Sequence, residues 1–422
     1  MEIKVLGAAK EVGRSGFQVN CDGTNFLLDY GVMFGKPRGA PPSYPLLVKP
    51  KDIDSVLLTH AHLDHSGNIP SLFANGNCHV YATPPTLELS RLLIEDMLKI
   101  EKNAHPFDIP ELNSMMRYGK EITYQQKISR GSASFEFRSS GHVLGGSTIL
   151  LEHEKKRLFY TGDINTRGSR MLQQADLDIG EIDLLITEST YSQTTQTPRA
   201  ESERKLIEFA NEVMDRNGVL FVPSFSVERS QEIACVLKSA NFQHKVIMDG
   251  MALRVNEIIL RYPEYLKDPN IFKDAISRSV SINDHKQRKE VLSEPCVVIS
   301  PAGMLVGGNA VFYLQQLAFE KRNGIALVSY QGDGTPGKKL LETGKISTRG
   351  KDLKVEAEVR RFEFSGHSDR NSLFDMIKNI KGDPKVLTVH GDENSCTKFA
   401  DEIQEKFGLD AYAPKLGEEI AV

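Results

Sequence analysis

The feature that most constrains this chain is a cluster of metal-binding side chains placed directly after an apolar segment. The string VLLTHAHLDHSG places His60, His62, Asp64 and His65 within six residues, behind a run that is typical of a buried strand. A strand that ends there leaves the backbone in a turn, so alternate side chains can converge on one point. Imidazole nitrogens and carboxylate oxygens suit Zn²⁺ and leave a position for water. The spacing therefore predicts a metal site, whereas a lone histidine would indicate only a structural or surface residue.

Other short apolar segments also end on polar residues. Asp29 ends NFLLD, Asp163 follows RLFYTG, and Glu188 follows IDLLIT. Layered α/β folds build their sites from residues at the carboxyl ends of strands, so these side chains are candidates for the same site. His142 lies in SSGHVLGGS, where on its own it would be interpreted as a buried, hydrogen-bonded histidine in a Gly-rich turn.

The pattern of strands changes near Pro198. Before it, short β-branched segments are separated by Gly-rich turns; after it, helices alternate with apolar strands, as in Ala200–Arg216 followed by Val219–Val222. This alternation favours βαβ units and a parallel sheet. Polar residues at strand ends return after Arg361. We therefore predict an outer domain at residues 1–189 and 362–422, split by an inserted α/β domain at residues 190–361.

Composition bounds the function without deciding it. The 422 residues carry a formal net charge of −4, which does not indicate nucleic-acid binding, since a chain of this charge must gather its basic residues along one groove to bind phosphates. Five cysteines without a CxxC pair argue against a disulfide framework and against a thiolate zinc site. The N-terminus lacks a signal-peptide core and no apolar run is long enough to cross a bilayer, so we expect a cytoplasmic protein without membrane contact.

The ordered motifs resemble those of the metallo-β-lactamase superfamily. HAHLDH looks like its signature, and Asp29, His142 and Asp163 match further motifs in the expected order. The resemblance implies an αββα sandwich that binds two Zn²⁺ ions per chain, with Asp29 supporting the ligands from behind. The ligands that it implies are His60, His62 and His142 for one ion, Asp64 and His65 for the other, and Asp163 for both.

Three motifs in the second half resemble motifs A, B and C of the β-CASP nucleases: LLITEST with Glu188, EFSGHSD with His367, and LTVHGDE with His390. The long insertion between Glu188 and His367 is another hallmark of that group. PSFSVERSQE, SPAGMLVGG and SYQGDGTPGKKL resemble its cleavage and polyadenylation specificity factor branch, which is related to RNase J. The resemblance covers essentially the whole chain and implies a Rossmann-like β-CASP domain inserted into the sandwich. It also implies a zinc-dependent ribonuclease, with RNA entering between the two domains.

The resemblance further implies roles in phosphodiester hydrolysis. We expect His367 to be the general acid for the leaving ribose oxygen, Glu188 to hold His367, and His390 to complete the second zinc site. Asp64 counts among the catalytic residues as well as the ligands. Two alternatives remain open: Glu188 is a surface carboxylate at a strand end, or His367 caps a helix.

RNA contacts are predicted in the inserted domain and in the segment that directly follows it. The segments that begin at Ser224 and Ser300 each follow an apolar strand and lead into a helix, whose free N–H groups favour phosphate. The predicted contacts are Ser224, Arg229, Gly303, Met304 and Ser365. Gly-rich turns also commonly do no more than end strands, so that alternative stays open. Tyr330 in SYQGDG could stack on a base, but we expect a buried aromatic side chain there.

Several functional alternatives remain at the level of the sequence. The long insertion argues against a small-ester hydrolase, and His390 in motif C argues against a DNA nuclease. The filled ligand positions argue against a non-catalytic subunit. The chain begins at the first expected strand and stops soon after motif C, which predicts the archaeal type without KH domains and disfavours a specialised role in transcription termination. The resemblance implies a homodimer. The sequence leaves open the transcript, any requirement at the 5′ end, the dimer interface, and the balance of endonucleolytic and 5′→3′ exonucleolytic cleavage.

Overall fold

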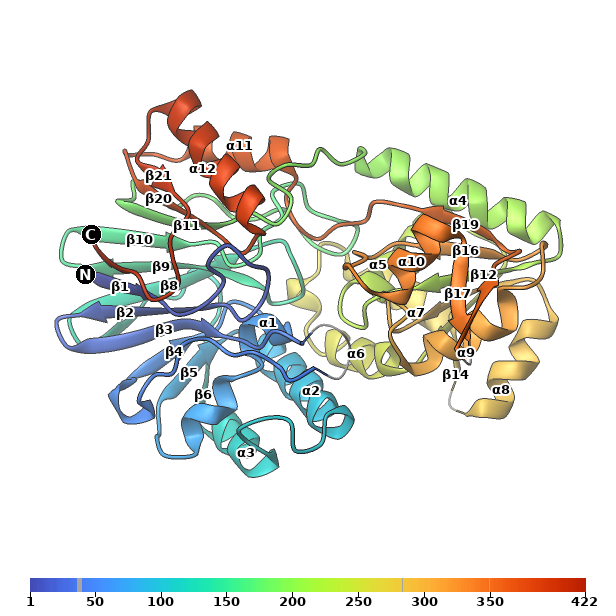
Figure 1. Ribbon diagram of the computed structural model, residues 1–422, viewed down its shortest axis with the longest axis horizontal. Coiled ribbons are helices and arrows are strands. Elements are labelled where there is room, and N and C mark those ends of the chain that lie inside the picture. The colour runs from blue at the N-terminus through green and yellow to red at the C-terminus, as the bar shows by residue number, and fades with distance from the viewer. Residues whose placement is uncertain (36–39, 283, 349) are drawn as a thin grey trace. The chain divides into compact units, whose positions relative to one another are not determined.

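A computed structural model describes residues 1–35, 40–282, 284–348 and 350–422. Contacts between residues divide the chain into two units (Figure 1). Unit 1 contains residues Met1–Gly168, Gln174–Thr195 and Gly366–Val422, and unit 2 contains Ser169–Gln173 and Gln196–Ser365. The short segment Ser169–Gln173, which the sequence pattern did not set apart, thus clusters with unit 2.

Unit 1 is built on two seven-stranded mixed sheets. The first sheet has the order β22 (Glu419–Ala421), β1 (Glu2–Val5), β2 (Gly16–Cys21), β3 (Thr24–Tyr30), β4 (Ser55–Leu57), β5 (His79–Ala82) and β6 (Gly119–Glu121). The second has the order β21 (Ala411–Tyr412), β20 (Lys385–Val389), β11 (Leu184–Glu188), β10 (Lys156–Tyr160), β9 (Ser147–His153), β8 (Ala133–Ser139) and β7 (Ile128–Arg130).

Three apolar layers hold these sheets together. Residues of both sheets, including Phe17, Phe135 and Ile186, form the core between them. The outer face of the first sheet packs on α2 (Pro84–Ile100) and α3 (Ile109–Arg117), beside the short α1 (Leu63–Ser66). The outer face of the second packs on α11 (Arg370–Asn379) and α12 (Glu393–Phe407) (Figure 1). Unit 1 is therefore the αββα sandwich that the motifs predicted. Short 3₁₀ helices lie at Pro50–Asp52 and Ile69–Phe73.

Unit 2 contains a six-stranded sheet in which every neighbouring pair is parallel. Its order is β14 (Val280–Ile282), β13 (Lys245–Asp249), β15 (Cys296–Ser300), β12 (Val219–Pro223), β16 (Gly324–Leu327) and β19 (Glu358–Arg361). The helices are α4 (Arg199–Asp215), α5 (Arg229–Ser239), α6 (Met251–Ile259), α7 (Pro269–Arg278), α8 (His285–Glu290), α9 (Gly308–Leu317) and α10 (Pro336–Thr343). The strand–helix alternation correctly predicted this parallel α/β architecture.

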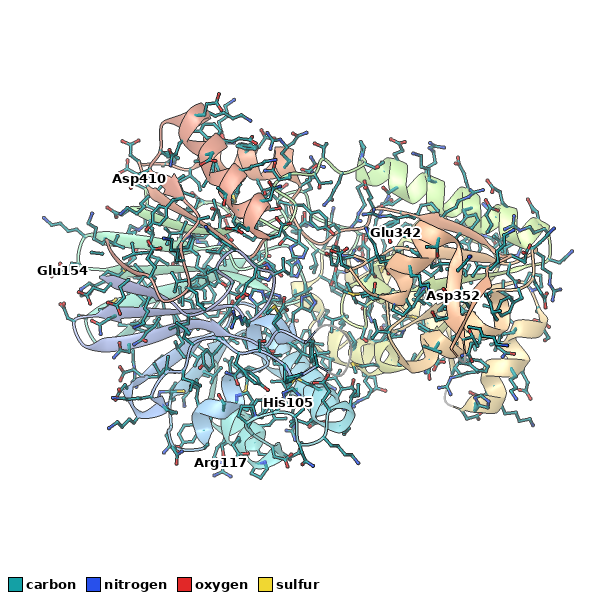
Figure 2. The ribbon with its side chains drawn as sticks, viewed as in Figure 1. His105, Arg117, Glu154, Glu342, Asp352 and Asp410 are labelled. Atoms are coloured by element: carbon teal, nitrogen blue, oxygen red, sulfur yellow. The ribbon has the colours of Figure 1, made fainter. Side chains whose placement is uncertain are left out.

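Smaller elements complete unit 2. Its remaining strands, β17 (Lys345–Thr348) and β18 (Lys351–Lys354), form a separate hairpin, and 3₁₀ turns lie at Pro263–Tyr265 and Val291–Ser293. Charged side chains such as Glu342 on α10 and Asp352 on β18 are exposed, as are Arg117 and Asp410 in unit 1 (Figure 2).

Local sequence signals explain where several helices begin. The Thr83 hydroxyl caps α2 ahead of two prolines, and Asp108 and Glu111 form a reciprocal capping box at α3. The Asp369 carboxylate caps α11 by accepting from the amide of Ser372. The alternative in which His367 caps this helix is therefore wrong. Among the described residues, no helix is both long and apolar enough to cross a membrane.

Candidate metal centre

The site lies where strands of both sheets of unit 1 end. Strands β10, β11 and β20 are parallel neighbours, and Glu188 at the end of β11 pairs with Val389 at the end of β20. Asp163 and His390 follow β10 and β20, so parallel register brings them to the edge that Glu188 occupies. Across the inter-sheet core, the turn after β4 carries His60 and continues into α1. The predicted convergence of polar residues at strand ends thus has a simple topological cause.

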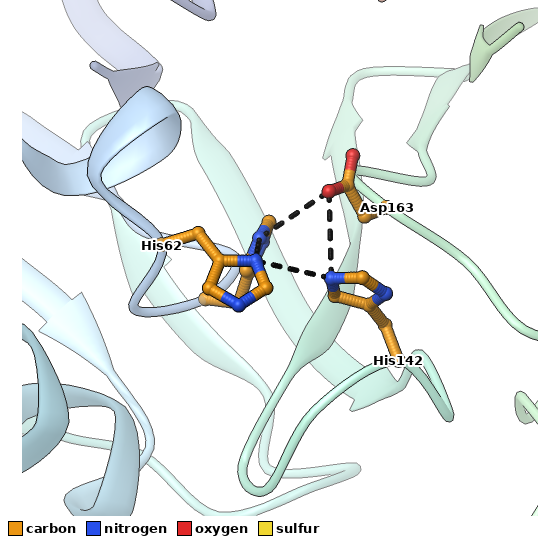
Figure 3. Close-up of side chains that lie close together, drawn as sticks. His62, His142 and Asp163 are labelled. Carbon is orange, nitrogen blue, oxygen red and sulfur yellow. Dashed lines mark hydrogen bonds and ion pairs between the residues drawn. The ribbon is translucent and has the colours of Figure 1, made fainter. Parts of the chain in front are cut away.

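The first group of candidate ligands is His60, His62, His142 and Asp163, whose ligand atoms all lie within 4.8 Å of one another. Figure 3 shows His62, His142 and Asp163 turned toward one another. His62 Nδ1 lies 3.1 Å from His60 Nε2 and 3.2 Å from His142 Nε2. Asp163 Oδ2 lies 3.4 Å from His60 Nε2 and 3.5 Å from His142 Nε2. Three imidazoles therefore face one carboxylate oxygen.

The second group is Asp64, His65 and His390, again with ligand atoms within 4.8 Å of one another. His390 Nε2 lies 3.3 Å from Asp64 Oδ2. The other oxygen of Asp163, Oδ1, lies 3.3 Å from both His65 Nε2 and His390 Nδ1. Asp163 therefore faces the first group with one oxygen and the second group with the other.

The donor set fits divalent metal ions. Asp163 is 2% exposed, and its buried Oδ1 has no hydrogen-bond partner. His142 Nδ1 donates to the carbonyl oxygen of Gly366 at 2.8 Å, and His65 Nδ1 donates to Asp29 at 2.7 Å. In the neutral His142 ring this donation leaves the lone pair on Nε2, which faces Asp163. Burial opposes protonation of His65, but the Asp163 and Asp29 charges outweigh it and raise the pKa of that ring well above its usual value. Imidazole and carboxylate lone pairs that face one another without a proton between them form an arrangement that a bound cation stabilises.

Electrostatics keeps the first group in a form that binds metal. Burial, together with the nearby His60, lowers the pKa of His62 to about 3. Burial and the charge of His367 hold the pKa of His142 well below its usual value. Burial disfavours the ionised form of Asp163, but the surrounding histidines outweigh it and hold its pKa well below the usual range. Neutral imidazoles facing an ionised carboxylate are the protonation states that metal binding requires.

Asp29 is the buried anchor behind these ligands. Besides His65, it accepts the backbone N–H of Thr59 at 2.7 Å, the Thr59 hydroxyl at 2.8 Å and the Tyr160 hydroxyl at 2.9 Å. Four donors saturate this carboxylate, which is 0% exposed. Burial and the Asp29 charge keep the pKa of Tyr160 well above its usual value, so the phenol remains a donor. Asp29 thus fixes both the tautomer and the orientation of His65.

His367 lies beside the two groups and not inside either. Its Nδ1 is 2.9 Å from Glu188 Oε2, and its Nε2 is 3.9 Å from Asp163 Oδ2. Burial opposes protonation of His367, but the Glu188 and Asp163 carboxylates outweigh it and raise the pKa to about 9. Glu188 is 1% exposed and accepts the backbone N–H of Ile164 at 2.7 Å. The alternative in which Glu188 is a surface carboxylate is therefore wrong.

The loop that carries His367 is bound to the loop that follows Asp163. The Ser368 amide donates to the Ile164 carbonyl at 2.7 Å, and the Thr166 amide donates to the Ser368 hydroxyl at 3.0 Å. Arg167 forms an ion pair of 2.9 Å with Asp369. These contacts hold the His367 imidazole beside Asp163 although the two residues are far apart in the chain.

Sequence reasoning missed three supporting residues. Thr59 and Tyr160 donate to Asp29, and the Thr190 hydroxyl lies 3.2 Å from His390 Nδ1. Thr59 directly precedes the histidine motif, so its position was a usable signal. Tyr160 and Thr190 reach their partners only through the register of neighbouring strands, which no local pattern specifies.

The predicted RNA-contact residues lie in unit 2, with Ser365 at its end. Ser224 is 0% exposed, its amide donates to the Ser300 carbonyl and its hydroxyl is 2.9 Å from that of Ser230. Arg229 is also buried, at 8% exposure, so neither residue is presented at the surface. Gly303 is buried, while Met304 and Ser365 are half-buried. Tyr330 is 51% exposed, so the expectation of a buried aromatic was wrong.

Three models of known protein families match successive segments of this chain. A metallo-beta-lactamase superfamily domain model matches residues 18–191, and a Beta-Casp domain model matches residues 230–340. A model described as a Zn-dependent metallo-hydrolase RNA specificity domain matches residues 352–414. The crystal structure of a protein of unknown function from Enterococcus faecalis V583 superposes with a TM-score of 0.65 at 14% identity, covering 100% of this chain and 99% of that one. The last likeness concerns the fold alone.

Curated relatives match along the whole chain. RNase aCSPSF2 of Saccharolobus solfataricus is 34% identical over 423 residues, which cover 100% of this chain and 85% of the relative. Probable RNase MJ4 of Methanocaldococcus jannaschii is 34% identical over 435 residues, with full coverage of both chains. Transcription termination factor FttA of the same organism is 34% identical over 447 residues, covering 98% of this chain and 70% of the relative. The chain belongs to the β-CASP family of metal-dependent ribonucleases, on the metallo-β-lactamase fold.

Proposed function

We propose that this ribonuclease binds two zinc ions, one in each group of ligands, and that Asp163 joins the two sites. His60, His62 and His142 would hold the first ion, and Asp64, His65 and His390 the second. The observation that carries the proposal is Asp163, a buried carboxylate that faces one group with each oxygen while Oδ1 lacks a hydrogen-bond partner. When bound, zinc supplies Lewis-acid charge beside the scissile phosphate and lowers the pKa of water.

His367 is the proposed general acid. Glu188 holds its Nδ1, which leaves Nε2 directed toward the ligand groups, where it can give a proton to the leaving ribose oxygen. The raised pKa supports this role, because the imidazole carries its proton at neutral pH. Asp64, whose side chain is 31% exposed, is the proposed ligand whose carboxylate also contacts the attacking water.

Further assignments complete the proposal. We propose that Gly303, Met304 and Ser365 contact RNA. Ser224 and Arg229, whose side chains are buried, belong to the same proposed set of contacts. The outer domain spans residues 1–189 and 362–422, with residues 190–361 inserted. We further propose that the enzyme acts in RNA processing or decay in the cytoplasm, and that it forms the homodimer that the family resemblance implies. Light scattering during gel filtration tests the dimer.

A time course with one RNA labelled at either end tests the activity. Zinc-loaded wild type is compared with His367→Ala. Early mononucleotide release from the 5′ label, dependent on a 5′ monophosphate, identifies 5′→3′ exonucleolytic cleavage. Discrete internal fragments from both labels identify endonucleolytic cleavage. Equal rates in wild type and the variant would overturn the general-acid role, and zinc bound per chain, measured by elemental analysis, tests the two-ion assignment independently.

A further inference from the structure

Tyr330 is an exposed aromatic side chain between buried neighbours. It is 51% exposed, whereas Ser329 and Gln331 on either side are each 8% exposed. The four residues of β16 that precede this segment are all buried as well. Exposure of a large side chain is common on protein surfaces and carries no meaning alone. The contrast between Tyr330 and its immediate neighbours is what requires explanation.

The Gln331 side chain ties the segment around Tyr330 to the neighbouring loop. Its Nε2 donates to the Gly303 carbonyl at 2.9 Å and to the Ser329 carbonyl at 3.0 Å. Gly337 leaves room for this side chain, since a Cβ there would lie 1.7 Å from Gln331 Oε1. These buried contacts of Gln331 hold the chain directly after Tyr330 against the Gly303 loop.

The ring of Tyr330 shares its surroundings with Met304. A Cβ built on Gly332 would meet Tyr330 Cε1 at 3.4 Å and Met304 Sδ at 3.7 Å, so ring and thioether both border this glycine. Thr335 donates through its amide and its hydroxyl to the Gly332 carbonyl, which fixes the turn. Tyr330 and Met304, which we call the platform, thus lie beside the same glycine.

The platform lies at the carboxyl edge of the parallel sheet of unit 2. Tyr330 follows β16, and Met304 follows β15. Parallel α/β sheets bind ligands at this edge, beside the loops that follow the strands. Because the enzyme acts on RNA, an aromatic face held in place there suits an unpaired base, which stacks on aromatic rings whatever its identity.

We propose that Tyr330, supported by Met304, is a stacking platform for one nucleobase of single-stranded RNA. The inference rests on the proposed ribonuclease function and adds a base-binding subsite to it. Stacking uses the ring and not the hydroxyl, so recognition is independent of base identity. Tyr330 is a binding residue and takes no part in the chemical step.

RNA binding measured with and without one base tests the platform. A fluorescent 12-nucleotide RNA is compared with versions that carry one abasic site at successive positions, using zinc-loaded His367→Ala to suppress cleavage. We expect Tyr330→Ala to weaken binding of the intact RNA about tenfold, within the range for loss of one stacked base. One abasic position should weaken binding to the Tyr330 protein by the same factor and leave the Tyr330→Ala protein unaffected. Tyr330→Phe should bind within about twofold of the parent protein.

Matched controls separate the platform from general effects. Phe319, also in unit 2, is 43% exposed, so Phe319→Ala removes a comparable aromatic surface and should not change binding. Thermal unfolding reports whether either variant is misfolded. The platform would be overturned if every abasic site weakened RNA binding by the same factor in the Tyr330→Ala protein as in the Tyr330 protein. It would also be overturned if Tyr330→Phe bound RNA as weakly as Tyr330→Ala.

Failure of the platform is distinguishable from failure of the proposed function. If His367→Ala cleaves RNA at the wild-type rate, the general-acid role is wrong, and the same comparison is then made from cleavage rates of otherwise unmodified protein. Under those conditions Tyr330→Ala should raise KM about tenfold and change kcat by less than about twofold, because a stacked base contributes to binding. A fall in kcat at unchanged KM would overturn the proposal.

Discussion

Each unit buries a carboxylate at the carboxyl end of a parallel strand, and the two carboxylates have opposite surroundings. In unit 2, Asp249 ends β13 and accepts from the Arg288 guanidinium, the Asn309 amide and the Tyr313 hydroxyl. In unit 1, Asp163 follows β10 and has one oxygen without any hydrogen-bond donor. Both side chains are almost fully buried, at 0% and 2% exposure.

The difference shows how each unit uses a buried charge. An ionised carboxylate is costly to bury unless it is paired and hydrogen-bonded. The protein itself supplies the partners of Asp249, which makes that carboxylate a structural link between β13, α8 and α9. By contrast, the protein supplies no hydrogen-bond donor to Oδ1 of Asp163 and surrounds this carboxylate with imidazoles, as expected where a cation binds. The next four predictions test this contrast, starting with the largest effect.

Replacing Asp163 should have the largest effect on activity. Asp163→Asn removes the charge that both ligand groups face, so zinc content should fall and RNA cleavage should drop at least about 10⁴-fold, given that Lewis-acid stabilisation is worth several kcal/mol. Elemental analysis and cleavage rates check the two effects. Asp249→Asn is the matched control and should retain its zinc. Full zinc content in Asp163→Asn would contradict the shared-ligand assignment.

Replacing His367 should lower the cleavage rate without removing metal. We expect His367→Ala to reduce kcat about 10³-fold, within the range for loss of a general acid. Zinc content should be unchanged, because His367 lies beside the ligand groups. Added imidazole should restore part of the rate if the missing group is a proton donor. Loss of zinc from the variant would instead make His367 a ligand.

Replacing Asp249 should affect stability and not chemistry. Asp249→Asn leaves the Arg288 guanidinium without its charged partner, which should lower the free energy of unfolding by about 3 kcal/mol. Urea denaturation measures the change, and the cleavage rate of the folded fraction should stay near that of wild type. A variant as stable as wild type would show that the internal pairing of Asp249 contributes little.

Two tyrosines give the smallest and closest comparison. Tyr160 and Tyr313 each donate to a buried aspartate at 2.9 Å, to Asp29 and Asp249 respectively. Tyr160→Phe should weaken zinc binding about tenfold, because Asp29 orients His65 and partners of this kind typically contribute 10- to 100-fold. Tyr313→Phe should leave zinc affinity unchanged. Competition with a chromophoric chelator measures both, and equal losses in the two variants would remove the distinction between the units.

The clustering of the candidate ligands could be predicted because it depends on local pattern. Each candidate ligand follows an apolar strand, except His142 in its Gly-rich turn, and parallel strands bring their carboxyl ends together whatever their order in the chain. Tyr160 could not be predicted, because its hydrogen bond to Asp29 joins two strands that are 131 positions apart in sequence. The buried state expected for Tyr330 was wrong: the segment beyond β16 buries Ser329 and Gln331 but leaves Tyr330 51% exposed, a difference that no local pattern specifies. Ser224 was expected near a free helix terminus, but the turn uses its amide and hydroxyl internally.

The order of residues along the chain has a consequence for how the enzyme is made. Strand β20 pairs with β11, yet almost the whole of unit 2 lies between them in sequence. A ribosome therefore releases His60, Asp163 and nearly all of unit 2 well before His367 and His390 emerge. Pairings between such distant segments also form slowly, because a long loop must close first. We expect the nascent protein to lack the complete group of candidate ligands, and with it the ability to cut RNA, until its last segment is synthesised.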